Sequence, residues 1–259
     1  MLGAIVGDIV GSVYEFNNHR SKEFPLFQES SHFTDDTILT IATADALMGD
    51  RDFATKYREY GKKYPSSYGS FFRSWIHDEN QGPYNSYGNG SAMRVSPVAW
   101  AFDTEEEVLA MAEATAIVTH NHPEGVKGAQ ATALAVFWAR NGRTPADIVN
   151  AIEKAFGYDI STSVDEIREY YEFDVTCQGT VPEALRCYLE ADGFEDTIRN
   201  AISIGGDSDT LAAIAGSFAE ATWGVPEEIG SQALDRLDAD LLNIYQDFRR
   251  QYSNRLTGV

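Results

Sequence analysis

The sequence predicts an all-α fold, a compact orthogonal bundle of many helices. Apolar residues recur at three- and four-residue intervals along most of the chain, whereas the alternation typical of strands is weak. Helix start signals, such as Thr104 before a run of glutamates and Thr144 before Pro145, precede several of these segments. The segments that predict helices are 53–60, 105–119, 123–140, 145–156, 181–190, 194–204 and 226–252.

The N-terminal segment predicts a helix that another helix can approach closely. Glycine recurs at every fourth position from Gly3 to Gly11, so one helix face carries no side chains. On a neighbouring face Asp8, Ser12 and Glu15 follow at i, i+4 and i+7. Because Asp8 and Ser12 lie among apolar residues, we expect both to be buried and the helix to direct Glu15 toward a pocket.

Two short acidic segments, 33–37 and 205–210, each lead directly into a helical pattern of small apolar residues, at 38–47 and 211–223. One Asp, Ser or Thr is enough to cap a helix, yet each segment carries two carboxylates and hydroxyls. If the two helix starts faced each other, four carboxylates would repel unless protonated or neutralised by divalent ions. Two unrelated surface caps are the alternative, but the pair favours a site for two hard cations.

The segment 79–97 predicts a loop, because glycine and proline interrupt it repeatedly. Gly82, Gly88 and Gly90 permit close approach and positive φ, so successive amides there are able to form an anion-binding nest. Two histidines, His120 and His122, follow at a helix start. Without a cysteine or a third histidine nearby, a hydrogen-bonding role is favoured over zinc ligation.

Composition favours a single domain, residues 1–259, of a cytoplasmic protein. Forty acidic residues against twenty Lys and Arg give a net charge of −20, which makes nucleic acid and anionic lipid unfavourable partners. The two cysteines, Cys177 and Cys187, do not suggest a disulfide framework. The apolar stretch 1–13 lacks basic residues and the length of a membrane span, so we expect no membrane anchor.

Taken in order, five motifs resemble the ADP-ribosylglycohydrolase family. They are the segments 7–15, 33–37, 87–94, 119–120 and 205–210, and the likeness extends from residue 1 to about residue 223. The resemblance implies a compact all-α domain that holds two Mg²⁺ or Mn²⁺ ions. It also implies hydrolysis of the bond that joins ADP-ribose to an acceptor, often an arginine or serine side chain, on a protein or a small molecule.

Carried over position by position, the resemblance implies three sets of site residues. Metal ligands would be Glu15, Thr34, Asp35, Asp36, Asp207, Asp209 and Thr210. The diphosphate-binding loop would be Ser86, Tyr87, Gly88, Asn89 and Gly90, and His120 would approach the ribose. Three stretches fit the family less well and are where acceptor selectivity would be built: 25–31, a loop at 64–83, and the acidic stretch 165–174.

The expected reaction is metal-assisted glycosidic hydrolysis through an oxocarbenium-like transition state. We expect Asp35 or Asp36 to activate water and Glu15 to move the leaving-group proton. A non-catalytic ADP-ribose-binding or structural protein is one alternative, although the retention of all seven oxygen donors argues against it. A metal-dependent phosphohydrolase of nucleotide diphosphates is the other, since clustered aspartates also serve that chemistry.

Overall fold

Helices make up all of the regular structure in the part of the chain that is described. The structure is a computed structural model, and it describes residues 1–252; residues 253–259 of the predicted domain lie outside it. Within 1–252 the elements run from α1 to α15, and the pairing of extended backbone is limited to one bridge between Gly88 and Thr176. The predicted all-α class is confirmed.

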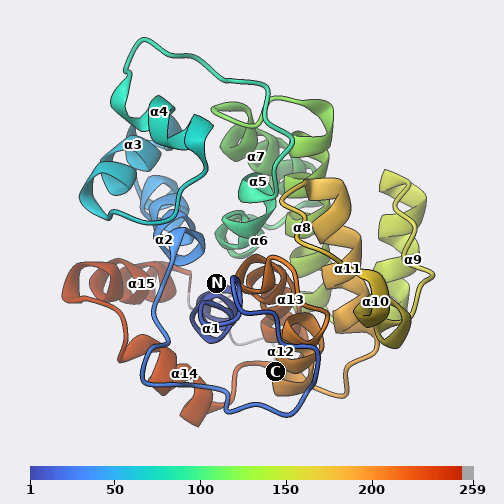
Figure 1. Cartoon of the computed structure of the whole chain (residues 1–259). Coiled ribbons are helices and arrows are strands. Elements are labelled where there is room, and N and C mark those ends of the chain that lie inside the picture. Colours follow the sequence, from blue (N-terminus) through green and yellow to red (C-terminus); the bar gives the residue numbers. More distant parts are fainter. Residues whose placement is uncertain (253–259) are drawn as a thin grey trace.

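Two helices from opposite ends of the sequence lie side by side at the centre of the bundle, α1 (Leu2–Gly11) and α13 (Ser208–Trp223) (Figure 1). The glycines of α1 face α13. A Cβ atom at Gly3 or Gly7 would lie 2.0 Å from a backbone carbonyl oxygen of α13, and Gly11 is similarly close. The predicted side-chain-free groove is therefore confirmed, and it brings the backbones of the two helices together.

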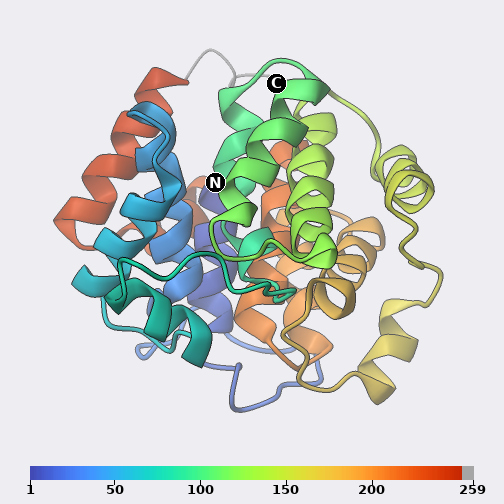
Figure 2. The same cartoon turned by 90° about the horizontal axis from the view of Figure 1, so that it is seen from above.

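Helices near α2 form one side of this central pair, and helices near α8 form the opposite side (Figures 1 and 2). In both views α15 and α9 lie at opposite edges of the molecule. The first side contains α2 (Asp35–Met48), α3 (Phe53–Lys63), α4 (Ser70–His77), α14 (Glu227–Leu234) and α15 (Ala239–Gln251). The second contains α5 (Gly90–Met93), α6 (Ser96–Ala101), α7 (Glu105–Ile117), α8 (Pro123–Arg140), α9 (Pro145–Phe156), α10 (Val164–Tyr170), α11 (Cys177–Leu189) and α12 (Phe194–Ser203).

Local capping interactions explain why the predicted helix starts are accurate. The side chain of Thr104 accepts from the amide of Glu107, and that of Thr144 accepts from Asp147, both at 3.2 Å. Such bonds satisfy first-turn amides that have no partner inside the helix. The helices α7 and α9 accordingly begin where the sequence pattern predicts, and the bounds of α8 also agree with the prediction.

The prediction of one continuous helix over 226–252 is wrong. The chain leaves α14 at Leu234 and starts α15 at Ala239, where the carboxylate of Asp238 accepts from the amide of Leu241 at 2.9 Å. Leu237 lies in the turn between the helices and is still buried. The apolar spacing therefore runs across the break, because the turn keeps the same face on the core.

Further expectations about loops and helix ends need correction. The loop predicted at 79–97 contains α5 and the beginning of α6, and the loop predicted at 64–83 contains α4. The helix predicted to start at 181 begins at Cys177 because Thr176 caps it, its hydroxyl accepting from the amide of Gly179 at 3.1 Å. Finally, α1 ends at Gly11, before Glu15.

A continuous set of buried apolar side chains from α1 to α15 forms the core. Its centre is the α1–α13 contact, where Ile5 and Ile9 are fully buried. Within residues 1–252, no helix combines the length and hydropathy that crossing a bilayer requires.

Candidate active site

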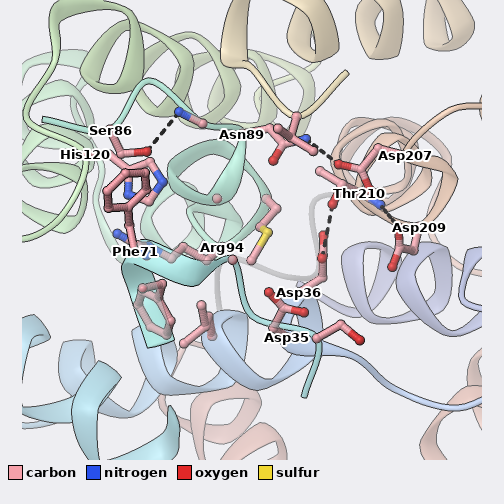
Figure 3. Close-up of a pocket in the computed structure, with 18 of the residues that line it drawn as sticks. Asp35, Asp36, Phe71, Ser86, Asn89, Arg94, His120, Asp207, Asp209 and Thr210 are labelled. Carbon is pink, nitrogen blue, oxygen red and sulfur yellow. Dashed lines mark hydrogen bonds between the residues drawn. The ribbon is translucent and has the colours of Figure 1, made fainter. Parts of the chain in front are cut away.

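A cavity of about 470 Å³ lies where the starts of α2 and α13 meet the segment before α5. Asp35 and Asp36 come from the start of α2, and Asp207 and Asp209 come from the start of α13 (Figure 3). In Figure 3, His120 lies at the left of the cavity, and Asp207 and Asp209 lie at the right. The structure thus brings the two acidic helix starts together in one cavity.

The backbone before α13 turns sharply to present its carboxylates. Gly205 and Gly206 have φ angles of +74° and +72°, a left-handed conformation that favours glycine. A Cβ atom on Gly206 would also lie 2.5 Å from the ring of Tyr171. Two glycines are therefore required directly before Asp207.

The carboxylates form two groups that share one residue. Oxygen atoms of Asp8, Asp36 and Asp209 lie within 4.8 Å of one another, and so do those of Glu15, Asp207 and Asp209. All of these residues are buried except Glu15, which is half-buried. Asp209 is therefore a member of both groups of carboxylate oxygen atoms.

Burial and mutual repulsion raise the pKa values of these groups. Burial, followed by the charges of Asp207 and Asp35, raises the pKa of Glu15 to about 7. Burial, followed by the charge of Asp8, raises the pKa of Asp35 to about 6. The pKa of Asp209 lies well above its ordinary value for the same reasons. In the absence of a cation, full ionisation of the cluster is therefore unfavourable.

The donor set fits hard divalent cations. Thr210 Oγ1 donates to Asp36 Oδ2 at 3.2 Å, but the other oxygen of Asp36 is buried and lacks a hydrogen-bond partner among residues 1–252. Buried polar atoms nearly always have a partner, and a carboxylate oxygen beside other carboxylates suits a cation. Mg²⁺ and Mn²⁺ prefer oxygen donors of this kind.

Asp8 is a member of the cluster that the sequence did not suggest as a ligand. Its Oδ2 accepts from the amides of Thr34 at 2.9 Å and Thr37 at 3.0 Å, and its Oδ1 accepts from Thr34 Oγ1 at 2.6 Å. Asp8 thereby holds the first turn of α2 from outside that helix. A carboxylate inside an apolar helix is the signal for such a role, because burying it requires partners. The expected burial is confirmed for Asp8, whereas Ser12 is only half-buried.

Glu15 reaches the cavity by a route different from the predicted one. After α1 ends at Gly11, the chain continues in turns, in which the amide of Tyr14 donates to the Gly11 carbonyl at 2.8 Å. Glu15 and the next residue, Phe16, both line the cavity. Glu15 is therefore carried by a turn and not by the helix that its spacing suggested.

Four of the five predicted loop residues line the cavity: Ser86, Gly88, Asn89 and Gly90. Tyr87 does not, because its ring packs edge-on against His122 at 5.3 Å. Thr34, although buried beside the acidic cluster, is not part of the cavity lining either.

The predicted anion-binding nest differs from the observed backbone. The amide of Gly88 donates to Ser86 Oγ at 3.1 Å, and that of Asn89 donates to the Val175 carbonyl at 2.8 Å. Neither Gly88 nor Gly90 has a positive φ. The glycines are used for close approach instead, since a Cβ atom on Gly90 would lie 3.0 Å from His120 Nε2.

Asn89 connects this loop to the acidic cluster. Its side-chain amide donates to Asp207 Oδ2 at 2.7 Å and to Thr180 Oγ1 at 3.1 Å, and both Asn89 and Asp207 are buried. Figure 3 shows the bond between Asn89 and Asp207 along one wall of the cavity. The orientation of one candidate metal ligand therefore depends on the loop that carries Ser86 and Gly88.

The two histidines have separate hydrogen-bonding roles, in agreement with the sequence-based preference. His120 lines the cavity, and its Nδ1 lies 2.7 Å from Thr119 Oγ1. Burial, and then the charge of Arg94, lowers the pKa of His120 well below its ordinary value, so the ring is neutral at pH 7. His122 lies at the start of α8, where its Nδ1 accepts from the amide of Glu124 at 3.1 Å.

Three of the aromatic side chains at the mouth of the cavity, Phe16, Phe71 and Phe173, were not predicted. Phe16 and Phe173 stack with ring centroids 6.3 Å apart, and Phe71 and Tyr84 stack at 5.9 Å. Phe71 belongs to the stretch 64–83 and Phe173 to 165–174, two of the three segments expected to set acceptor selectivity. The third segment, 25–31, does not reach the cavity.

Comparison with known proteins assigns the chain to a family. The ADP-ribosylglycohydrolase family model matches residues 1–256. The ADP-ribosylhydrolase ARH3 of Mus musculus is 25% identical, over 95% of this chain and 91% of that protein. The ADP-ribosyl-[dinitrogen reductase] glycohydrolase of Rhodospirillum rubrum is 27% identical, over 96% and 92%. A solved structure described as an ADP-ribosylglycohydrolase-related protein complex has the same fold, with a TM-score of 0.73, 23% identity and 97% of each chain covered. The chain therefore belongs to the ADP-ribosylglycohydrolase family.

Proposed function

We propose that this protein hydrolyses the glycosidic bond between ADP-ribose and an acceptor in a reaction that depends on two Mg²⁺ or Mn²⁺ ions. The observation that carries the proposal is the pair of carboxylate groups joined at Asp209, at one end of a cavity of about 470 Å³. Cavities of this size bind nucleotide-sized ligands. The relatives named ADP-ribosylhydrolase and ADP-ribosyl-[dinitrogen reductase] glycohydrolase support the same reaction.

The acidic cluster would hold the ions through Glu15, Asp207 and Asp209 on one side and through Asp36 and Asp209 on the other. Asp35, Thr34 and Thr210 are further donors around the same helix starts. When bound, such ions neutralise the carboxylates and polarise the oxygen atoms of a sugar or water.

The remaining residues of the cavity would bind and orient the substrate. Ser86 and Gly90 line the cavity, and His120 lies against the glycines, where it is able to hydrogen-bond a ribose or phosphate oxygen. Asn89 keeps Asp207 in place through its hydrogen bond. Together these contacts would hold the ribose at the carboxylates and the diphosphate along the glycine segment.

Proton transfer would use carboxyls of the acidic cluster. Hydrolysis breaks the bond between the anomeric carbon and the acceptor, so one group must accept a proton from water and another must protonate the leaving group. Glu15, which the turn after α1 carries to the cavity and which is only half-buried, is our candidate for moving the proton to the leaving group. Asp35 or Asp36 is the candidate base, and the cluster also favours the positive charge that develops on the sugar.

The test is incubation with arginine- and serine-linked ADP-ribosyl peptides, with Mg²⁺ or Mn²⁺ and with a chelator, followed by mass analysis of the products. We expect metal-dependent release of ADP-ribose, and the peptide that is cleaved identifies the acceptor. Asp209→Asn should abolish release, whereas Asp238→Asn, a helix-capping aspartate that is exposed and outside the cavity, should not. Release of AMP, with ribose 5-phosphate left attached to the peptide, would instead indicate a phosphohydrolase.

A further inference from the structure

Arg94 is a fully buried cation whose charge is balanced without a carboxylate. Within residues 1–252 it takes part in no ion pair. Its Nη2 donates to the carbonyl of Thr115 at 2.9 Å, and its guanidinium lies 4.1 Å from the ring centroid of Tyr57. The carbonyl belongs to the last turn of α7, the negative end of the helix dipole, and the aromatic face also attracts a cation.

The same guanidinium nitrogen also contacts Thr119. Nη2 of Arg94 donates to Thr119 Oγ1 at 2.8 Å, and Thr119 Oγ1 lies 2.7 Å from Nδ1 of His120. A guanidinium is only a donor, so the threonine oxygen uses a lone pair for Arg94 and keeps its own proton available for His120. A neutral imidazole that accepts at Nδ1 carries its proton on Nε2.

The surrounding charges favour the same tautomer. The unprotonated nitrogen is the negative end of the neutral ring, and here Nδ1 is on the side of Arg94 and Thr119. Nε2 lies against Gly90, which lines the carboxylate-containing cavity. The cation also disfavours the doubly protonated ring, in agreement with the lowered pKa of His120.

We propose that Arg94 and Thr119 are positioning residues that hold His120 as a neutral imidazole whose Nε2–H is a hydrogen-bond donor inside the cavity. The Nε2–H of His120 would donate a hydrogen bond to a ligand oxygen. That oxygen would be an acceptor only, such as a diphosphate oxygen, or a hydroxyl acting as acceptor. The identity of that ligand rests on the proposed function, whereas the tautomer does not.

Tyr84 provides the competing arrangement. Its hydroxyl also interacts with Thr119, and burial raises its pKa to about 12, so it remains protonated. If Thr119 donated to Tyr84, its oxygen would accept Nδ1–H of His120 and the tautomer would be reversed. The 2.7 Å contact with Nδ1 and the nearby cation favour the first arrangement.

The tautomer is tested by ¹⁵N NMR of the imidazole nitrogens in ligand-free protein, with His120→Asn to assign the signal. We expect an unprotonated Nδ1 and a protonated Nε2 in the wild type, in Thr119→Ser, which retains the hydroxyl, and in Tyr84→Phe. Thr119→Val has nearly the same shape but no hydroxyl, and we expect a changed or mixed tautomer. A wild-type Nδ1–H, or a Thr119→Val spectrum identical to the wild type, would overturn the proposal.

Calorimetry with ADP-ribose in the presence of Mg²⁺ tests the role of the donor. Thr119→Val should bind about two- to tenfold more weakly, the effect of one hydrogen bond, while Thr119→Ser should bind like the wild type. Equal affinity of the valine variant would show that the tautomer does not serve the ligand. If the wild type itself bound no ADP-ribose, the proposed function would fail, and the NMR result would still decide whether Arg94 and Thr119 position His120.

Discussion

Asp209 belongs to both clusters of carboxylates in the cavity. Its negative charge is unfavourable in the metal-free protein and would be favourable beside bound cations. Without a cation, burial and then the charges of Asp207 and Asp36 raise its pKa well above the ordinary value. With divalent ions, the same charge would be favourable. Through this residue, the proposed metal binding would change the stability of the protein.

We expect Asp209→Asn to stabilise the metal-free protein at pH 8 by roughly 1–2 kcal/mol, because it removes a buried charge among like charges. It should also abolish the rise in melting temperature that we expect Mn²⁺ to produce in the wild type. Thermal unfolding with and without Mn²⁺ measures both effects. Asp238→Asn, which keeps a capping side chain on α15, is the matched control, and an Mn²⁺ response retained in Asp209→Asn would contradict the assignment.

Asn89 is a residue whose effect on metal binding should be indirect. It holds Asp207 through a bond of 2.7 Å, and partners of this kind typically change metal affinity by about 10–100-fold when removed. Asn89→Ala should therefore weaken Mn²⁺ binding by about that factor in calorimetry. Asn80→Ala, at an exposed position, should leave it unchanged; equal affinities in both variants would show that Asp207 needs no support from the loop.

At the scale of elements, the contact between α1 and α13 determines where the acidic residues lie. The glycine face of α1 allows the two backbones to touch, and Gly11 packs against Asp209 itself, with a Cβ atom there only 2.4 Å from the Asp209 Cα. Because α13 begins at this contact, its first turn is held beside Asp8. The contact that packs α1 against α13 therefore also fixes the positions of the acidic residues in the site.

Gly7→Ala should accordingly be strongly destabilising. The added Cβ would lie 2.0 Å from the Ala212 carbonyl oxygen, and α1 can avoid it only by moving away from α13. We expect a loss of roughly 3 kcal/mol or more in urea unfolding, at the upper end of overpacking effects. Gly49→Ala, whose Cβ would meet nothing closer than 3.7 Å, should change stability little. Comparable stability of the two variants would show that the helices adjust without cost.

The whole molecule carries a net charge of −20, and its most crowded carboxylates are buried together in one cavity. The folded-state pKa of Glu15 is about 7 against 4.5 for the free group, and that of Asp35 is about 6 against 3.8. These two carboxyls therefore bind more protons in the folded protein than in the unfolded chain between about pH 4 and 7. By linkage, the free energy of unfolding falls as pH rises through this range.

The metal-free protein should thus melt at a higher temperature at pH 5 than at pH 8, and Mg²⁺ should reduce the difference by neutralising the cluster. Melting curves at constant ionic strength, in chelator and in Mg²⁺, test this. Asp209→Asn should show a shallower dependence in chelator. Stability that rises with pH in the metal-free wild type would contradict the proposed crowding of charges.

Local signals in the sequence were sufficient for the fold class and for much of the site. Apolar periodicity and capping residues such as Thr104 and Thr144 act within a few positions, so they identify α7, α8 and α9 without tertiary information. The acidic segments at 33–37 and 205–210 could also be recognised without tertiary information. Each has two carboxylates at one helix start, whereas capping needs only one, and the extra carboxylate indicates a further role.

Only the tertiary structure decided which side chains reach the cavity. The turn after α1 places Glu15 there, and packing against His122 turns Tyr87 away. Asp8 joins the cluster because α1 crosses the start of α2, and Phe173 arrives from a segment remote in sequence. Periodicity states which face of a helix is apolar, but contacts between distant segments determine what that face meets. By itself, therefore, the sequence determined an all-α chain with two acidic helix starts, and the packing of distant helices decided how these starts, the loop before α5 and His120 form one site.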